Sequence, residues 1–519
     1  MPKSKSVEQA DDHPAIVSGE DYIQSLRDRE LSLYYLGQRI SNYVDHPVIR
    51  PSINAVAATY DLALTHPELA LTQSPFTGKS INRFLHIASS RDDLIQQNKM
   101  QRKLGQLTGT CFQRCVGMDA LNALFSVTFE IDQKCGTTYH ERLKSFITLT
   151  HQKNLVIGGA MTDVKGDRSK APHQQADPDL FVRVVKRSED GVWISGAKAH
   201  QTGCINSHWL LVMPTLRLSE KDKDYAIVGA IPVDAPGITY VYGRQSCDLR
   251  SLESGSMDQG NARFGGQEAM LILKDVFIPW NQVFMHGEVD FAAMLVERFT
   301  CYHRRSYVCK SGVGDVLIGA AASAADYNGV PNVSHIREKL VEMTHLNETI
   351  YATGMASSYQ SHETKSGCFI NDDMLANVCK HHVTKIPYEI SRLAQDLAGG
   401  LMVTMPSQAD FENAEVGPLI ERFLKGRPDA PTEDRMKILR LIENMTLGRN
   451  AVGYLTESMH GAGSPQAQRI QIARQMQLDY KMHLARELAG IQSPPIESPA
   501  TGQYFDRVFP SDKPHAKDV

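Results

Sequence analysis

The sequence predicts an α+β protein in which a helical region comes first, a β-rich region follows and a second helical region closes the body. Three observations predict this order: long helix-compatible stretches in the first 150 residues, β-rich runs separated by turn residues from about residue 181, and helical spacing of apolar residues in the last third. A chain of 519 residues exceeds what one hydrophobic core usually serves, so two or three structural regions are expected.

The first region, residues 1–150, is predicted to be helical. Residues 93–104 and 119–133 are compatible with helices, and turn signals lie at Asp45-His46-Pro47 and at Pro75. The second region, residues 151–285, is predicted to be a β-domain. It begins with two β-rich runs around Asp190-Gly191 and continues with WLLVMPTLRL, YAIVGAIPV, ITYVYGR and AMLILKDVFIP.

The third region, residues 286–492, is predicted to be helical again. Its apolar residues recur every three or four positions at Ile336, Leu340, Met343, Leu346 and Ile350. Thr432 is predicted to cap a helix whose apolar face comprises Ile438, Leu441, Ile442 and Met445. Pro465 is predicted to start one long helical stretch that ends near residue 491. Residues 493–519 are rich in proline and polar residues, which predicts an extended tail.

The composition excludes several classes of partner. The chain is 42% hydrophobic and 22% charged, and its net charge of −4 offers little attraction to nucleic acid or to an anionic membrane. No apolar run reaches the roughly 18 to 20 residues of a membrane span, and the beginning of the sequence lacks the apolar core of a secretory signal. We therefore expect a cytoplasmic protein.

Nine cysteines in a reducing compartment indicate metal ligation, redox chemistry or burial rather than a disulfide framework. Cys111 and Cys115 are four residues apart, so both thiols would project from one face if the segment is helical. Farther along, Cys301, His303 and Cys309 lie beside the basic residues Arg304, Arg305 and Lys310, which favour thiolates. The alternatives are buried structural cysteines, a hydrogen-bonded core histidine and a solvated basic face.

Many longer segments resemble those of the 4-hydroxybutyryl-CoA dehydratase/vinylacetyl-CoA delta-isomerase family. They include NYVDHPVIRPSIN, KMQRKLGQLTGTCFQRCVGMDA, GAMTDVKGDR, GAKAHQTGCINSH, VERFTCYHRRSY and GYLTESMHGAGSPQAQRI. The family is related to the 4-hydroxyphenylacetate monooxygenases and has an acyl-CoA dehydrogenase-like fold. The resemblance implies a helical N-terminal domain, a central β-barrel that binds flavin and a C-terminal four-helix bundle. It also implies a homotetramer with FAD between the subunits.

The resemblance further implies a [4Fe-4S] cluster bound by three cysteines and one histidine, which by position are Cys111, Cys115, His303 and Cys309. The family form between the last two ligands is HRQSYGGC, whereas HRRSYVC in this chain is one residue shorter. If the shorter loop displaces Cys309, the neighbouring Cys301 is the alternative ligand. The remaining cysteines are expected to be buried: Cys135, Cys204, Cys247, Cys368 and Cys379.

The implied reaction is an oxygen-sensitive radical dehydration of 4-hydroxybutyryl-CoA to crotonyl-CoA, with isomerisation of vinylacetyl-CoA. FAD would accept one electron, and a cluster iron would act as a Lewis acid on the leaving hydroxyl. The resemblance implies that His303 and Glu457 are the acid-base pair. It assigns supporting roles to Tyr307, Lys310, Glu268, Gln113 and Arg102. The alternatives are that Glu268 pairs with a buried arginine and that Arg102 lies on a helix surface.

For the flavin, MTDVKGDR is predicted to be a loop whose amides, cation and glycine suit a pyrophosphate. Its candidate binding residues are Met161, Thr162, Asp163, Lys165, Gly166, Asp167 and Arg168. The site would continue through His200, Gln201, Thr202 and Asn206, and residues 398–407 would reach the FAD of a neighbouring subunit. No GxGxxG sequence stands in a strand-turn-helix setting. For such glycine-rich segments the alternative is an ordinary turn.

Two other functions compete with this interpretation. A two-component FAD-dependent aromatic monooxygenase of the 4-hydroxyphenylacetate 3-monooxygenase type would need reduced flavin and oxygen but no cluster. A cluster-based redox sensor would need no intact acid-base pair. The four cluster-ligand positions argue against the monooxygenase. Glu457, together with the flavin segments, argues against the redox sensor.

Overall fold

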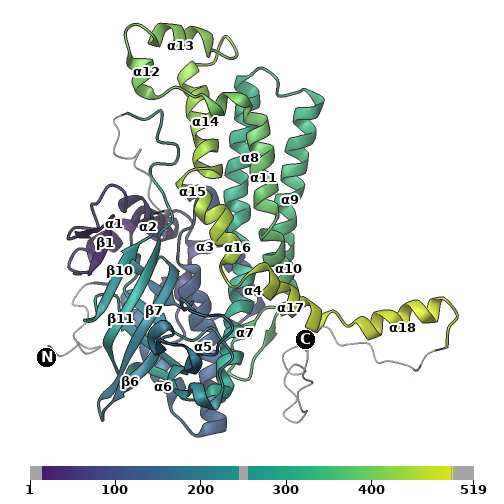
Figure 1. The fold of residues 1–519 in the computed structure, drawn as a ribbon. Coiled ribbons are helices and arrows are strands. Elements are labelled where there is room, and N and C mark those ends of the chain that lie inside the picture. Colours follow the sequence, from purple (N-terminus) through teal and green to yellow (C-terminus); the bar gives the residue numbers. More distant parts are fainter. Residues whose placement is uncertain (1–13, 245–254, 493, 495–519) are drawn as a thin grey trace.

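The computed structural model describes residues 14–244, 255–492 and 494. Cys247 and the predicted proline-rich tail, apart from residue 494, lie outside the described residues. A sheet-containing part with surrounding helices adjoins a taller group of long helices, and α18 projects from the body (Figure 1).

The first region is mainly helical, as predicted. Its helices are α1 (Gly19–Ser25), α2 (Arg50–Thr65), α3 (Pro67–Ala70), α4 (Arg91–Thr108), α5 (Cys115–Cys135) and α6 (Tyr139–Lys153). It also contains short strands that were not predicted: β1 (Leu33–Tyr35), β2 (Gln38–Ile40), β3 (Leu71–Gln73) and β4 (Ser80–Asn82). Three residues give almost no alternation signal, and β1 pairs in parallel with β10, about 200 residues farther along the chain.

The predicted β-region forms two sheets. Its strands are β5 (Ile157–Ala160), β6 (Arg183–Arg187), β7 (Gly191–Thr202), β8 (Trp209–Val212), β9 (Ile227–Pro232), β10 (Ile238–Tyr242), β11 (Glu268–Pro279) and β12 (Val283–His286). The larger sheet has the order β2-β1-β10-β11-β7-β6 and the smaller one β12-β9-β8-β5. The predicted hairpin around Asp190-Gly191 is confirmed by the antiparallel pairing of β6 with β7.

The expected closed β-barrel is wrong, because within the described residues both sheets are open. Helices cover the two edges of the smaller sheet, where a closed barrel would need further strands to pair. A side chain at Gly117 of α5 would lie 1.9 Å from the carbonyl oxygen of Ile157 in β5, so α5 touches this strand's backbone. At the other edge, Arg142 of α6 donates a hydrogen bond of 2.8 Å to the Trp280 carbonyl just before β12. Helix packing therefore takes the place of further strand pairing.

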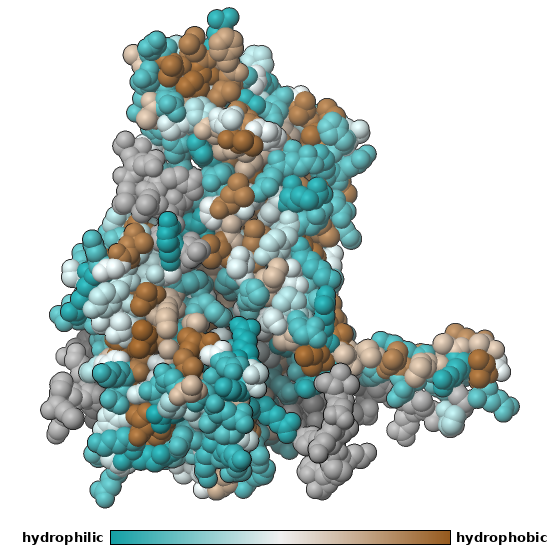
Figure 2. Space-filling view, in the orientation of Figure 1, coloured by the Kyte–Doolittle hydropathy of each residue, from teal (hydrophilic) through white to brown (hydrophobic). Residues whose placement is uncertain are grey.

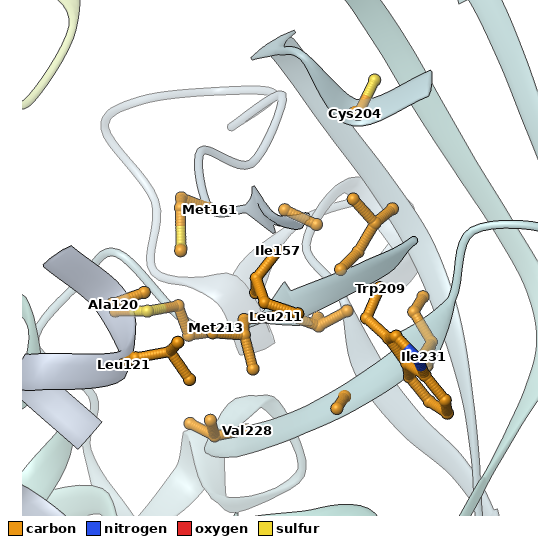
Figure 3. Packing of buried hydrophobic residues seen from close by; sticks show 14 of the residues in the cluster. Ala120, Leu121, Ile157, Met161, Cys204, Trp209, Leu211, Met213, Val228 and Ile231 are labelled. Atoms are coloured by element: carbon orange, nitrogen blue, oxygen red, sulfur yellow. The ribbon is translucent and has the colours of Figure 1, made fainter. Parts of the chain in front are cut away.

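A buried apolar core joins α5 to the smaller sheet. Figure 3 shows Ala120 and Leu121 of α5 in one cluster with side chains of β8 and β9, including Trp209 and Ile231. All four side chains are at most 1% exposed. This packing fixes α5 against the sheet and so fixes the position of its first turn, which begins at Cys115.

The last region contains α7 (Val289–Ser306), α8 (Cys309–Tyr327), α9 (Ser334–Tyr359), β13 (His362–Glu363), β14 (Phe369–Ile370), α10 (Asp373–Val383), α11 (Ile386–Ala398), α12 (Gln408–Glu412), α13 (Gly417–Phe423), α14 (Thr432–Thr446), α15 (Arg449–Ala451), α16 (Glu457–His460), α17 (Pro465–Gln475) and α18 (Leu478–Leu488). Helices α8, α9, α11 and α14 pack along one another around a second core (Figure 1). The stretch 289–327 is apolar and long enough to cross a membrane, but 67% of its most apolar window is buried inside the protein, as in core helices.

Glycines allow α4 of the first region to touch α8 of the last. A side chain at Gly105 would lie 2.5 Å from the Cys309 carbonyl oxygen, and one at Gly312 would lie 2.0 Å from that of Arg102. The two backbones are therefore in direct contact. This contact brings the start of α8, where Cys309 lies, against the helix that leads to Cys111.

Two helix boundaries differ from the predictions. Thr432 is the first residue of α14 rather than its cap, because its hydroxyl donates to the Glu421 carbonyl instead of accepting from the helix. The single helix predicted after Pro465 is broken between α17 and α18, where Gln477 adopts a φ of 48°. Left-handed backbone at a non-glycine residue interrupts helical hydrogen bonding.

Candidate active site

One small cavity lies where α5, α7, α8, α16 and the end of β7 meet. Its walls come from four separate stretches of sequence. The lining residues are Cys111, Gln113, Cys115, Val116, Thr202, His303, Ser306, Tyr307, Cys309, Lys310 and Glu457. The structure thus brings together all four expected cluster ligands, the expected base Glu457 and three of the five residues expected to support the chemistry.

Cys111 and Cys115 do not share a helix face, because the segment that joins them is not helical. Helix α4 ends at Gly109 in left-handed conformation, and α5 starts only at Cys115, which leaves Cys111 in the connecting loop. Gln113 in this loop has a φ of 67°. Its side chain donates to the Ser52 carbonyl at 3.0 Å and accepts from Asn206 at 2.7 Å. The loop is therefore held by long-range hydrogen bonds, and through it both thiols reach the cavity.

Cys309 is the first residue of α8, immediately after the short link from α7. A hydrogen bond with Cys115 and the nearby Lys310 ammonium hold the pKa of Cys309 below its ordinary value, although burial opposes this. The same bond raises the pKa of Cys115. Desolvation raises the pKa of Cys111 to about 12, with Lys310 acting in the opposite direction. The hydrogen bond from Cys115 and the Lys310 ammonium both favour a thiolate at Cys309.

Cys301 lies outside this group. It is fully buried on α7, where its thiol donates to the Asn371 carbonyl at 3.2 Å, and it does not line the cavity. Cys204, Cys368 and Cys379 are buried as expected. Cys135 is exposed, contrary to expectation, because it is the last residue of α5, where the helix ends at the surface.

Glu457 is held by two donors in the cavity wall. The Tyr307 hydroxyl donates to one carboxylate oxygen at 3.0 Å, and the Lys310 ammonium donates to the other at 3.0 Å. Burial alone would raise the pKa of Glu457, but Lys310, Lys380 and the Tyr307 bond outweigh it and hold this pKa below its ordinary value. Burial and Glu457 raise the pKa of Tyr307, so its phenol stays a donor. A π-helical turn, Val452–Thr456, directly precedes Glu457, as often occurs at functional sites.

Glu268 behaves in the opposite way. Burial and the nearby Glu457 raise its pKa well above the ordinary value. It accepts a hydrogen bond of 2.6 Å from Thr202, which lines the cavity, although Glu268 itself does not. Two carboxyl groups whose pKa values are driven apart suit one acid and one base.

Lys380 of α10 was not identified from the sequence. Its side chain is fully buried, donates to the Ser458 carbonyl and lies with its ammonium 4.0 Å from the centre of the Tyr307 ring. Burial lowers the pKa of Lys380 to about 7, while Glu457 opposes the shift. The sequence around it, VCKHHV, contains no motif that points to the cavity, so only the packing of α10 could reveal this cation.

Arg102 lies apart from the cavity. Its guanidinium donates to Asp315 at 3.0 Å and also binds Glu348, and it stacks 4.5 Å from the ring centre of Tyr351. These partners are on α8 and α9. Arg102 therefore joins helices instead of orienting the groups in the cavity.

The predicted flavin loop follows β5 and is fastened to β7. The buried Asp163 carboxylate pairs with the Lys198 ammonium at 2.9 Å and accepts from the Val182 amide, so it anchors the loop. Gln201 accepts from the Met161 amide at 2.9 Å and donates to the Thr162 carbonyl. The turn at Gly166, Asp167 and Arg168 is exposed.

The residues expected to bind flavin form a strip that is continuous with the cavity. The strip consists of residues 161–168 with His200, Gln201, Thr202 and Asn206. Burial lowers the pKa of His200, Lys165 lowers it further and Glu457 raises it. Asn206 bonds to Gln113 of the cysteine loop, and Thr202 belongs to both the strip and the cavity. Residues expected to hold two different cofactors thus share one wall.

The donor set is of the kind that binds an iron-sulfur cluster. Among the residues that the structure describes, no three His, Cys, Asp or Glu side chains come close enough to share one metal ion. In a [4Fe-4S] cluster each ligand binds a different iron, so its ligands surround a larger body. Three cysteines and one imidazole around a cavity with a neighbouring ammonium have the required chemistry.

Two family models and a characterised relative match this chain. The profile "4-hydroxyphenylacetate 3-hydroxylase N terminal" matches residues 18–285, and its C-terminal counterpart matches residues 292–490. The chain is 54% identical to 4-hydroxybutyryl-CoA dehydratase/vinylacetyl-CoA-Delta-isomerase from Clostridium aminobutyricum, over 92% of this chain and 100% of that protein.

Solved structures extend the comparison. An oxygen-tolerant archaeal 4-hydroxybutyryl-CoA dehydratase from N. maritimus is 68% identical, with a TM-score of 0.92 over 95% of this chain and 99% of the other. The oxygenase component of 4-hydroxyphenylacetate 3-monooxygenase, in complex with FAD, is 20% identical, with a TM-score of 0.80 over 91% and 98% of the two chains. The latter similarity concerns the fold alone.

Proposed function

Because the chain belongs to the 4-hydroxybutyryl-CoA dehydratase family, within the wider 4-hydroxyphenylacetate 3-hydroxylase family, we propose that it converts 4-hydroxybutyryl-CoA to crotonyl-CoA with release of water. We further propose that it isomerises vinylacetyl-CoA. One observation carries the proposal: a single cavity contains three cysteines, a histidine and an ionised carboxylate with its donors.

Cys111, Cys115, His303 and Cys309 would hold a [4Fe-4S] cluster, and the strip from Met161 to Arg168 with His200, Gln201, Thr202 and Asn206 would bind FAD. When bound, FAD supplies a one-electron acceptor and the cluster supplies a Lewis-acidic iron. The continuity of the strip with the cavity, through Thr202 and the bond from Asn206 to Gln113, supports the use of both cofactors on one substrate.

The proton chemistry would belong to side chains of the cavity. Glu457 is ionised and faces the cavity, so it can accept a proton from a substrate carbon, while Lys310 and Tyr307 fix its orientation. Glu268, whose pKa is raised by burial and by Glu457, would be the acid partner next to the cavity, where it accepts a hydrogen bond from the Thr202 hydroxyl. His303 would act as a ligand and second base.

We also propose a cytoplasmic homotetramer. Figure 2 shows apolar patches over the cap formed by α12 and α13 and along the projecting α18. The exposed side chains include Leu419 and Phe423 of the cap and Leu478, Leu484 and Leu488 of α18. Such surfaces support contacts with further copies of the chain.

The decisive experiment is anaerobic purification followed by quantification of iron, sulfide and FAD, with assays of crotonyl-CoA formation from 4-hydroxybutyryl-CoA. We expect about four irons per chain, as a [4Fe-4S] cluster requires, and activity that depends on them. Iron-free protein that uses reduced flavin and oxygen to hydroxylate 4-hydroxyphenylacetate would instead establish the aromatic monooxygenase. A parallel sample kept in air measures the expected oxygen sensitivity, which matters because the relative from N. maritimus is described as oxygen tolerant.

A further inference from the structure

A buried carboxylate outside the cavity contacts the His303 imidazole. Asp119 of α5 is 1% exposed, and one of its oxygens lies 2.8 Å from Nδ1 of His303. Its other oxygen accepts from the Ser306 hydroxyl at 3.0 Å and lies 3.6 Å from the guanidinium of Arg305. Asp119 is four residues after Cys115 on α5, so the helix that carries one expected ligand also orients a second one.

These contacts determine which imidazole nitrogen faces the cavity. The other Asp119 oxygen accepts from Ser306 and faces the Arg305 cation, and a carboxylate accepts hydrogen bonds rather than donating them. Nδ1 of His303 must therefore carry the proton and donate it. The unprotonated nitrogen, Nε2, then belongs to the edge of the ring away from Asp119, and His303 lines the cavity. A neutral imidazole with a free Nε2 is the form that binds a metal.

The ring is also fixed by its aromatic neighbours. Phe299, one helical turn before His303, stacks on it with ring centres 5.3 Å apart and an angle of 16° between planes. Tyr307, one turn after it, meets the ring edge-on at 5.4 Å. With Asp119 bonded at Nδ1, the imidazole is held by a carboxylate and two aromatic rings while it lines the cavity.

We infer that Asp119 is a positioning residue that selects the Nδ1-protonated form of His303 and directs Nε2 at the cluster position. The inference rests on the proposed function, in which His303 is the nitrogen ligand. Arg305 makes the arrangement possible, because it compensates the buried charge and is itself bonded to Asn98 and Gln97 of α4. Carboxylates that orient metal-binding histidines in this way typically contribute about 10- to 100-fold to metal affinity.

The first test uses the cluster-loaded enzyme and two matched variants on the same helix. Asp119→Asn should weaken cluster retention about 10- to 100-fold under a chelator. It should also change the histidine nitrogen coupling in electron–nuclear double resonance of reduced protein that carries isotopically labelled histidine. Asp132→Asn is the control, because Asp132 of α5 binds the Tyr139 and His140 amides and lies outside the cavity. Asp119→Glu should restore part of the coupling.

The second test needs no cluster. In iron-free protein, diethyl pyrocarbonate should modify His303 at Nε2 in the wild type and in Asp132→Asn, and several-fold more slowly in Asp119→Asn, as measured by peptide mass spectrometry. A wild-type nitrogen coupling and chelator resistance in Asp119→Asn would overturn the inference and leave the dehydratase proposal intact. Wild-type protein without iron would overturn the proposed function instead. That outcome does not depend on the rate at which diethyl pyrocarbonate modifies His303.

Discussion

Two sets of cysteines among the described residues differ in what surrounds their thiols. Cys111, Cys115 and Cys309 border a cavity with the Lys310 ammonium beside them. Cys301 and Cys379 do not line this cavity, and their thiols are directed at the Asn371 and Ile350 carbonyls. Burial raises the pKa of Cys379 to about 12, whereas the pKa of Cys309 is lowered. A position on the cavity wall, rather than a neighbouring cation, thus distinguishes the expected ligand cysteines from the core cysteines.

The basic residues show the same contrast. Lys310 and Lys380 are fully enclosed and face Glu457 and Tyr307, where each charge alters the chemistry of the cavity. Arg102 binds Asp315 and Glu348 near the surface, where water screens the interaction. The effect of a basic residue on the chemistry of the cavity therefore depends on whether it is buried beside the cavity or screened by water near the surface.

The largest effect should come from replacing one cysteine of the cavity set, with one cysteine of the core set replaced for comparison. Cys309→Ala should lose most of its iron and essentially all dehydratase activity, because the cluster would lack one of four ligands. Cys301→Ala should keep its iron, since Cys301 does not border the cavity. Iron and sulfide analysis of both variants after anaerobic purification measures this. Loss of the cluster in Cys301→Ala alone would move the fourth ligand to Cys301.

Glu457→Gln should keep the cluster but lower kcat by about 10² to 10⁴, the usual contribution of a general base. The amide cannot accept a proton, although it retains a bond from Tyr307. Steady-state kinetics together with iron content separate the two effects. An active variant would remove Glu457 from the acid-base pair.

Lys380→Met should lower activity less, by roughly 10-fold, and should change how stability depends on pH. Burial lowers the pKa of Lys380 to about 7 from an ordinary 10.5. Between these values the unfolded chain binds a proton that the folded protein does not, so wild-type stability rises with pH across this window. Lys380→Met should therefore be the more stable protein at pH 6.5, and its advantage should shrink towards pH 9.

Melting temperatures of both proteins over this pH range test the prediction. Lys339→Met is the control, since Lys339 pairs with Asp396 at a partly exposed site. If the difference in melting temperature between wild type and Lys380→Met does not vary with pH, Lys380 stays charged over the whole pH range.

The smallest effect should follow Arg102→Gln. Partly exposed ion pairs contribute about 1 kcal/mol or less, so we expect a lower melting temperature by a few degrees and kcat/KM within about two-fold of wild type. Thermal unfolding and steady-state assays measure both quantities. A loss of activity comparable to that of Glu457→Gln would contradict the separation of Arg102 from the cavity.

Local patterns in the sequence were sufficient for much of the fold. The helices around residues 93–104 and 119–133 and the hairpin at Asp190-Gly191 were predicted because their signals lie within a few neighbouring residues. The open sheets were not predictable in this way, because α5 and α6 cover edges formed by strands far away in sequence. The break before α18 depends on a single left-handed residue, Gln477, which carries no glycine signal.

The sequence by itself determined which residue types could serve a cluster and a carboxylate base, since identity and resemblance are properties of single positions and short segments. Only the tertiary structure decided that Cys309 and not Cys301 borders the cavity, that Cys111 reaches it from a loop, and that Lys380 and Asp119 stand behind Tyr307 and His303. The reason is physical: the direction of a side chain and the charge beside it depend on which helices pack together, and that packing joins residues up to 340 positions apart.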